Sequence, residues 1–297
     1  MICPHCGQNA RVFLRATTKE VKPEGETFLY HACPNCGLIF LRPIPANLSD
    51  YYADDYYAYQ TPTGVEQLAD MLPYQENAKL ELVQGYKANG RLLDVGAGYG
   101  GFVYRAKNAG YDGSAIEMSP RCCAFLRDHV GVTTYPSSDP AATLATLGSY
   151  DVITLWHVIE HLADPFAMID AIADHLAPGG IMVIGAPNPD SFQFHLFKTR
   201  WQALEAPRHV QFIPGRLIAA RAESHGLVTR LVTSYDAMSV RADYTYWYEH
   251  FTAPFANPTL KRIGRIVGGG LRKIAKPFEQ RGERGSYITV ICQKPAI

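Results

Sequence analysis

The 297-residue sequence lacks a net charge, because 28 lysines and arginines balance 28 aspartates and glutamates. A neutral chain has no general attraction for polyanions, so we expect nucleic acid not to be a partner. The sequence also lacks an apolar run of the about 18 residues that a transmembrane helix needs. Its first residues, Met1–Pro4, show no basic segment followed by an apolar core. We therefore expect no secretory signal and a cytoplasmic location.

Cysteine is sparse, at seven residues, and in a cytoplasmic protein it indicates thiols or metal rather than disulfides. Four of the seven form two C-x-x-C-G motifs, Cys3–Gly7 and Cys33–Gly37. Two such motifs supply four sulfurs, which suits one tetrahedral zinc ion. We expect a structural zinc ribbon over residues 1–42, with Val12–Leu14 and Thr27–Tyr30 paired as a hairpin. The expected zinc ligands are Cys3, Cys6, Cys33 and Cys36.

The ribbon has no basic stripe: residues 1–40 carry four basic and three acidic side chains. A structural role or a substrate lid is therefore favoured over nucleic-acid recognition. A linker rich in tyrosine follows, at about residues 43–73. Its segment 51–59 is either a surface packed by aromatic rings or a wall of a substrate site. Residues 74–87 are amphipathic and predict the helix that opens the main domain, residues 74–297.

The stretch Leu92–Gly101 predicts a ligand site. Arg91–Val95 is a short apolar strand, four glycines follow within six positions, and Phe102–Asn108 reads as a helix. Glycine lets a backbone approach a ligand closely, and free N–H groups at a helix N-terminus attract polar or anionic groups. A simple glycine turn without a ligand is the alternative.

Strands and helices alternate beyond this stretch. This pattern predicts an α/β fold, with a doubly wound, mostly parallel, seven-stranded sheet and helices on both faces. Ligands then bind outside the carboxyl ends of the strands. The seven expected strands are Arg91–Val95, Tyr111–Glu117, Val132–Tyr135, Tyr150–Trp156, Ile181–Ala186, Leu227–Ser234 and Ser286–Gln293.

Two kinds of cofactor fit the glycines. Gly96, Gly98 and Gly101 satisfy the dinucleotide fingerprint, G-x-G-x-x-G. However, an acidic residue, Asp94, stands in the strand end, and about ninety residues precede the loop. The stretch resembles the S-adenosylmethionine (SAM) loop of class I methyltransferases, D-x-G-x-G-x-G. The resemblance implies a Rossmann-like methyltransferase domain.

The expected cofactor site extends beyond the loop. Glu117, at the next strand end, can accept hydrogen bonds from both hydroxyls of a ribose, and Met118 can lie against adenine. The loop 136–139 is expected at the adenine edge. The full set of expected cofactor-binding residues is Asp94, Gly96, Ala97, Gly98, Gly100, Glu117, Met118, Trp156 and His157.

The segment after the fourth strand contains His157, Glu160 and His161 as H-x-x-E-H, the inverse zinc-peptidase motif. Asp164–Pro165 starts a new helix, so the long helix of such a peptidase cannot form. The segment instead resembles the E-H-x-x-D-P stretch of a methyltransferase group that includes ubiquinone-pathway O-methyltransferases and small-RNA 2′-O-methyltransferases. A later His209-Val210-Gln211-Phe212 is also similar to that group.

The resemblance implies a SAM-dependent methyltransferase, and His161 or His209 is the expected general base. In the small-RNA enzymes the corresponding motif, E-x-x-E-H, and a later His hold a divalent cation. Here His157 replaces the first glutamate of that motif, so Mg²⁺ or Mn²⁺ at His157, Glu160, His161 and His209 stays an open alternative.

We expect O-methylation of a small-molecule or glycan acceptor, such as a sugar or natural-product hydroxyl. An RNA methyltransferase that uses the ribbon for substrate binding is the main alternative, and C- or N-methylation stays open. The competing enzyme class is a nicotinamide oxidoreductase, and the competing non-enzyme class is a domain that binds the ligand without turnover. The oligomeric state stays open.

A helical segment is expected as an insertion at about residues 240–284. Six basic residues alternate with apolar ones between Pro258 and Lys276, so the segment could lie on a membrane surface as a peripheral contact. The prediction favours two short helices instead, because Gly268–Gly270 should break a long one.

Overall fold

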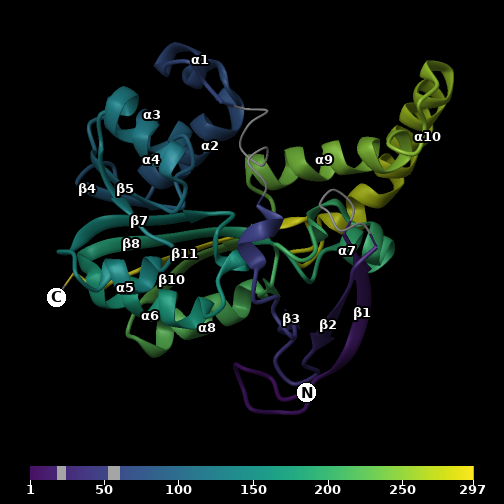
Figure 1. The fold of residues 1–297 in the computed structure, drawn as a ribbon, viewed down its shortest axis with the longest axis horizontal. Helices are drawn as coiled ribbons and strands as arrows, with labels where there is room; N and C mark the ends of the chain where they lie inside the picture. The colour runs from purple at the N-terminus through teal and green to yellow at the C-terminus, as the bar shows by residue number, and fades with distance from the viewer. Residues whose placement is uncertain (19–24, 53–60, 297) are drawn as a thin grey trace. The chain divides into compact units, whose positions relative to one another are not determined.

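The computed structural model describes residues 1–18, 25–52 and 61–296 (Figure 1). Most of the tyrosine-rich segment, residues 53–59, lies outside the described residues. The chain divides into two compact units. The first unit comprises Met1–Tyr51, Ala186–Gly215 and Thr233–Thr289, and the second comprises Tyr52–Gly185, Arg216–Val232 and Val290–Ile297.

A seven-stranded sheet forms the centre of the second unit, with the order β10-β11-β8-β7-β4-β5-β6. The β4 strand pairs in parallel with both β5 and β7, and β5–β6 and β7–β8 are also parallel. All seven predicted strands are confirmed. The strands are β4 (Arg91–Val95), β5 (Asp112–Glu117), β6 (Thr133–Pro136), β7 (Tyr150–Trp156), β8 (Leu176–Pro187), β10 (Val228–Thr233) and β11 (Tyr287–Gln293).

The strand order explains where a ligand would bind. From β4 the chain moves outward to β5 and β6, and then returns to the other side of β4 at β7. The reversal makes the ends of β4 and β7 a topological switch point, where doubly wound sheets bind their ligands. The glycine stretch follows β4, and the segment with His157 and His161 follows β7.

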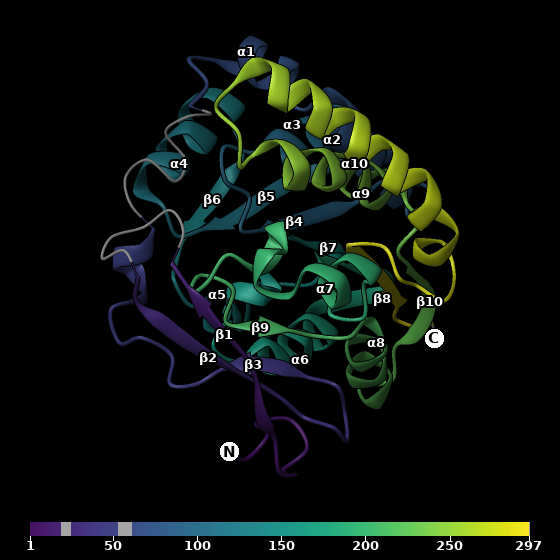
Figure 2. The same ribbon diagram turned by 90° about the vertical axis from the view of Figure 1, so that its right-hand side faces the viewer.

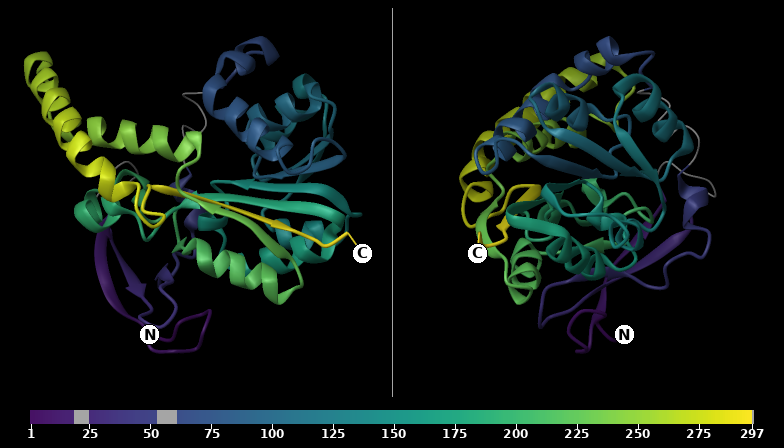
Figure 3. Two further views of the ribbon diagram at one scale, coloured as in Figure 1. Left: turned by 180° about the vertical axis from the view of Figure 1, so that it is seen from behind. Right: turned by 90° about the vertical axis from the view of Figure 1, so that its left-hand side faces the viewer.

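Helices cover both faces of this sheet, as Figures 1 and 3 show. Helices α2, α3 and α4 lie on one face, and α5, α6 and α8 lie on the other. The helices of this part of the chain are α1 (Val65–Asp70), α2 (Pro73–Gln84), α3 (Gly101–Asn108), α4 (Pro120–Phe125), α5 (Pro140–Leu144), α6 (Pro165–His175) and α8 (Gly215–Ser224).

Local caps start two of these helices where the sequence predicts. The Ser119 side chain accepts a hydrogen bond from the Cys122 N–H at the start of α4, and Asp164 accepts one from the Ala167 N–H at the start of α6. In both helices proline occupies the first position, where a missing N–H costs nothing.

The first unit contains a four-stranded sheet with the order β1-β2-β3-β9. Its strands are β1 (Arg11–Thr17), β2 (Thr27–Ala32), β3 (Ile39–Leu41) and β9 (Gln211–Phe212). The predicted hairpin is confirmed, since β1 and β2 are antiparallel with Leu14 opposite Tyr30. The last strand comes from much later in the chain: β3 pairs with β9, with Ile39 opposite Phe212. Buried aromatic side chains of both segments, including Tyr30, Trp201 and Phe212, share one apolar core.

Three helices complete the first unit: α7 (Phe192–Phe197), α9 (Ala237–Thr252) and α10 (Pro258–Glu279). Figure 2 shows α10 as the long yellow-green helix beside α9. The prediction that Gly268–Gly270 ends a helix is wrong, because α10 continues through all three glycines. A Cβ atom on Gly264 would lie 2.1 Å from the Phe251 carbonyl oxygen, and one on Gly268 would lie 2.8 Å from that of Trp247. Glycine here permits close backbone packing on α9, and this contact supports the helix.

Within the described residues, 1–18, 25–52 and 61–296, no helix is both long and apolar enough to span a bilayer.

Candidate functional site

The loop after β4 is built from glycines in a left-handed conformation. Gly96, Gly98 and Gly100 have φ values of 71°, 56° and 86°. A Cβ on Gly96 would lie 2.3 Å from Val158 Cγ2, whereas one on Gly98 would meet no atom within 4 Å. Gly96 is therefore required by packing within the protein, and Gly98 leaves its backbone open to a ligand.

The N–H groups of these three glycines all donate hydrogen bonds within the protein. The Gly96 N–H donates to the Ile116 carbonyl, and the Gly100 N–H donates to the Ala97 carbonyl. The Gly98 N–H donates to the Glu117 carboxylate at 2.8 Å. The glycines thus shape the loop and let a ligand approach, while their N–H groups hold the loop to its own chain and to β5.

Asp94 lies at the end of β4 and is buried. Its Oδ1 accepts a hydrogen bond from the Thr154 hydroxyl of β7 at 2.7 Å. Burial raises the pKa of the Asp94 carboxyl to about 7, although the Thr154 hydrogen bond acts in the opposite direction. The carboxyl is therefore an acceptor held in a fixed orientation between the two strands that flank the switch point.

Glu117 closes β5 directly beside the loop. One carboxylate oxygen accepts the Gly98 N–H and the other accepts the Ser119 N–H, both at 2.8 Å. Burial raises the pKa of Glu117, and these backbone donors oppose the shift. Each carboxylate oxygen can accept a second hydrogen bond, so the geometry suits the two hydroxyls of a ribose. Met118, which follows, is 50% exposed and can cover a flat ring.

Trp156, at the end of β7, is buried and has its indole ring edge-on to Phe102 of α3, with the ring centres 5.7 Å apart. Its Nε1–H has no hydrogen-bond partner within the part of the chain that the structure describes. The Lys79 ammonium of α2 lies 5.4 Å from the centre of the ring. An unused buried donor next to the glycine loop is compatible with a ligand acceptor at this position.

Two residues of α2 reach this region without any signal in the sequence. Glu76 is buried, pairs with Lys79 at 2.8 Å, and lies against Gly101, where an added Cβ would be 3.5 Å from Glu76 Cγ. One Glu76 oxygen, Oε2, has no partner among the described residues. The amphipathic pattern of residues 74–87 indicated a helix but not which of its polar residues faces the loop.

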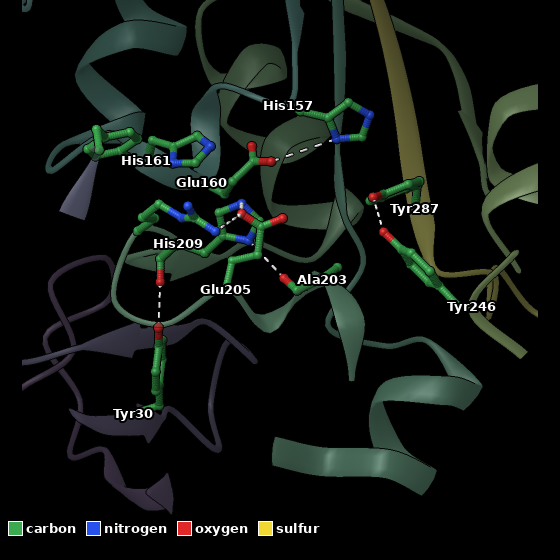
Figure 4. A network of polar contacts seen from close by, with 11 residues as sticks. Tyr30, His157, Glu160, His161, Ala203, Glu205, His209, Tyr246 and Tyr287 are labelled. Atoms are coloured by element: carbon green, nitrogen blue, oxygen red, sulfur yellow. Dashed lines mark hydrogen bonds and ion pairs between the residues drawn. The ribbon is translucent and has the colours of Figure 1, made fainter. Parts of the chain in front are cut away.

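His157 follows β7 with a φ of 60°, a left-handed conformation that is uncommon for a residue with a side chain. Its N–H donates to the Gly185 carbonyl of β8. Its Nδ1 lies 3.7 Å from Glu160 Oε1 (Figure 4). Backbone strain of this kind occurs at functional sites, where the surrounding structure holds it in place.

His161 ends the single helical turn Ile159–His161 that follows β7. Its Nδ1 lies 2.7 Å from the Tyr52 hydroxyl, and the two rings are in contact. Tyr52 is the described end of the tyrosine-rich segment, and its pairing with His161 was not predicted. When His161 Nδ1–H donates to Tyr52, the lone pair is on Nε2, so the imidazole can accept a proton there.

His209 belongs to the first unit and is buried there. Its Nδ1 lies 2.7 Å from the Ala203 carbonyl oxygen, and its Nε2 lies 3.8 Å from Glu205 Oε2 (Figure 4). Its own carbonyl accepts a hydrogen bond from the Tyr30 hydroxyl of β2 at 2.7 Å. The zinc-ribbon hairpin therefore holds the backbone at His209, and the Ala203 carbonyl orients its ring.

The four N-terminal cysteines form a cluster. The sulfurs of Cys3, Cys6, Cys33 and Cys36 all lie within 4.8 Å of one another. The Cys3–Cys36 and Cys6–Cys33 sulfur pairs are 3.7 Å and 3.5 Å apart. Four thiolates around a tetrahedral zinc ion would be about 3.8 Å apart, since the Zn–S bond is about 2.3 Å. The donor set and its dimensions fit zinc.

Residues 66–232 match the protein family described as a methyltransferase domain. Two curated relatives are ubiquinone biosynthesis O-methyltransferases. The protein of Bordetella avium (strain 197N) is 31% identical over 163 residues, which cover 50% of this chain and 68% of the relative. The protein of Cereibacter sphaeroides (strain ATCC 17025 / ATH 2.4.3) is 34% identical over 117 residues, which cover 37% of this chain and 47% of the relative.

A solved structure shows the same fold. The crystal structure of a SAM-dependent methyltransferase from Archaeoglobus fulgidus aligns with a TM-score of 0.54 at 17% identity, covering 81% of this chain and 100% of that chain. The predicted Rossmann-like α/β fold is confirmed by this similarity and by the strand order.

Proposed function

Because this chain belongs to the methyltransferase-domain family, we propose that it transfers a methyl group from SAM to a hydroxyl of a small-molecule acceptor. The observation that carries the proposal is the position of Glu117, whose carboxylate is held by the Gly98 and Ser119 N–H groups at the end of β5. The relatives are named O-methyltransferases, which supports a hydroxyl as the acceptor group.

The cofactor would occupy the ends of β4, β5 and β7. Glu117 accepts its ribose hydroxyls, Met118 covers the adenine, and the backbone at Gly98 allows the cofactor to approach closely. Asp94, Gly96, Ala97 and Gly100 shape this loop, and Trp156 and His157 bound it at the end of β7. When bound, SAM supplies a methyl group made electrophilic by a sulfonium.

His161 is the proposed general base. In the tautomer that we propose, His161 Nδ1–H donates to the Tyr52 hydroxyl and Nε2 is basic. Nε2 takes the proton of the acceptor hydroxyl while the oxygen forms its bond to the methyl carbon and the bond from sulfur to that carbon breaks. His209 is the second candidate for this role, because the Ala203 carbonyl fixes its Nδ1 and leaves Nε2 basic in the same way.

The acceptor class that we propose is a sugar, glycan or natural product that carries the hydroxyl. The neutral chain offers no general attraction for a polyanion, which argues against RNA. We also propose that Cys3, Cys6, Cys33 and Cys36 hold one structural zinc ion.

Binding is tested first. Calorimetric titrations with SAM, S-adenosylhomocysteine and NADH should show binding of the first two only. Binding of NADH without SAM would overturn the proposal in favour of an oxidoreductase. Binding to RNA that weakens steeply with salt would overturn the small-molecule acceptor.

Turnover is tested next with labelled SAM and a panel of glycosides and phenols. The His161→Ala variant should lower kcat by roughly 10²–10⁴-fold and leave SAM affinity unchanged. The Tyr52→Phe variant should shift the pH profile of kcat, since it removes the hydroxyl that is hydrogen-bonded to His161 Nδ1. The matched control is His175→Ala, because His175 lies on α6 and its Nδ1 is hydrogen-bonded to the Ala171 carbonyl of the same helix. Full turnover of His161→Ala at every pH would exclude His161 as the base, and rescue by Mg²⁺ or Mn²⁺ would indicate a metal-bound hydroxyl instead.

A further inference from the structure

Helix α10 has three distinct faces. Gly264, Gly268 and Ala275 are buried and form the face toward α9, and Glu279 is buried at the end of the same row. At 3.6 residues per turn, a second row lies beside this face at spacings of three and four positions. This row, which we call the apolar stripe, consists of Leu260, Ile263, Val267, Leu271, Ile274 and Phe278.

The apolar stripe is exposed along the whole helix. Ile274 is 68% exposed, Ile263 is 51% exposed, and even Leu271 is 39% exposed. Ile266, next to the stripe, is 69% exposed. A soluble surface rarely carries so many large apolar side chains in one contiguous row, so such a row marks an interaction surface.

Positive charge lies on the side of α10 opposite the stripe. The basic residues are Lys261, Arg262, Arg265, Arg272, Lys273 and Lys276. The helix has one acidic residue, Glu279, which is buried and accepts a hydrogen bond from the Trp247 indole at 2.6 Å. Although the chain as a whole is neutral, every exposed charged side chain of α10 is therefore basic.

We propose that α10 docks the protein on an anionic lipid surface. The apolar stripe would enter the boundary between headgroups and acyl chains, and the basic side chains would contact lipid phosphates from the polar side. The helix of 22 residues is about 33 Å long and would lie flat. Its packing on α9 through Gly264 and Gly268 keeps the stripe directed away from α9.

The charge pattern favours a lipid surface over a second copy of the chain. Two α10 helices that met through their stripes would bring two cationic helices together without acidic partners, because Glu279 is buried. An anionic bilayer supplies the missing negative charge and the apolar phase together. This inference concerns where the protein acts, and it does not depend on the identity of the acceptor.

The test is co-sedimentation of the purified full-length protein with phosphatidylcholine vesicles, with and without phosphatidylglycerol. We expect binding to the anionic vesicles that weakens as salt rises. The double variant Ile263→Glu, Ile274→Glu, which places two carboxylates in the stripe, should lower this binding by at least about tenfold. Lys261→Gln, Arg265→Gln and Lys276→Gln together should remove the preference for anionic lipid.

Val12→Glu is the matched control, because Val12 is 53% exposed on strand β1 of the N-terminal sheet rather than on α10. It should bind vesicles as the unaltered protein does. Circular dichroism and SAM affinity confirm that each variant is folded. Equal binding of the double variant and the unaltered protein would overturn the proposal. A second result would also overturn it: the unaltered protein does not bind vesicles and is a dimer by light scattering, whereas the double variant is a monomer.

Discussion

At the scale of single residues, Gly96 and Gly98 have different roles in the same loop: Gly96 is required by internal packing, and Gly98 leaves the backbone open to a ligand. An alanine at position 96 would meet Val158 at 2.3 Å and would also be strained at a φ of 71°. An alanine at position 98 has open space and meets only the strain of a φ of 56°. We predict that Gly96→Ala lowers the free energy of unfolding by about 2–4 kcal/mol and Gly98→Ala by about 1 kcal/mol.

The Gly98→Ala variant should also show an effect on the affinity for SAM. Gly98→Ala should weaken SAM binding while the protein stays folded, because the new methyl group lies where the cofactor would approach. Calorimetry and thermal unfolding measure both effects. Unchanged SAM affinity of Gly98→Ala would show that the cofactor does not pass over this backbone.

Asp94 makes stability depend on pH. Burial raises its pKa in the folded protein to about 7, above the ordinary value of 3.8. The native state therefore favours the protonated form, so the contribution of Asp94 to the free energy of unfolding is largest below about pH 4 and is lost as pH rises through about 7. The full difference corresponds to on the order of 4 kcal/mol.

We predict that Asp94→Asn reduces this decline in the cofactor-free protein. Urea unfolding at about pH 5 and about pH 8 measures it. The variant should retain the Thr154 hydrogen bond through the amide oxygen. Asp174→Asn, at an exposed carboxylate of α6, is the control. A decline of the same size in Asp94→Asn would assign the pH dependence to other groups.

The sequence predicts the site residues that belong to one short motif. Asp94, the glycines and Glu117 stand at fixed offsets in a strand, a turn and the next strand end. Glu76 and Lys79 could not be found in this way, because the pattern of α2 carries no mark of the residues that face the loop. For Tyr52 the sequence marked the segment 51–59 as a possible substrate wall, but not the contact with His161.

At the scale of elements, α9 and α10 depend on glycines at two of their contact points. We predict that Gly264→Ala lowers the free energy of unfolding by about 2 kcal/mol or more, because its Cβ would lie 2.1 Å from the Phe251 carbonyl oxygen. Gly270→Ala, in the same helix, should instead raise it by about 0.5–1 kcal/mol, since an added Cβ meets nothing within 4 Å and alanine favours the helix. Urea unfolding of both variants measures this, and equal effects would contradict the packing of α10 on α9.

This helix also shows why some elements are predictable and others are not. The seven strands and the capped starts of α4 and α6 follow from alternation and from Ser119 and Asp164, which act within a few residues. The reading of Gly268–Gly270 as a break followed the intrinsic propensity of glycine. The prediction was wrong because packing on α9 stabilises α10, and the helix propensities of single residues carry no information about such tertiary contacts.

At the scale of the whole molecule, zinc should hold the first unit together without taking part in cofactor binding. We predict that Cys33→Ser loses the zinc and lowers the unfolding temperature, since a structural zinc site contributes several kcal/mol to folding. SAM affinity should persist, because the proposed cofactor residues belong to the second unit. Metal analysis, thermal unfolding and calorimetry test this. Cys122→Ser, outside the cluster, is the control, and full zinc content in Cys33→Ser would refute the site.

The pairing of β3 with β9 has a consequence for how the chain is made. The Tyr30 hydroxyl and the His209 carbonyl that it contacts are 179 positions apart, and the N-terminal sheet has no fourth strand until Phe212 has left the ribosome. At about 5–20 residues per second, that delay is roughly 10–40 s. During synthesis the four cysteines therefore belong to an unfinished sheet, and early capture of a metal ion would protect their thiols from oxidation while the rest of the chain is translated.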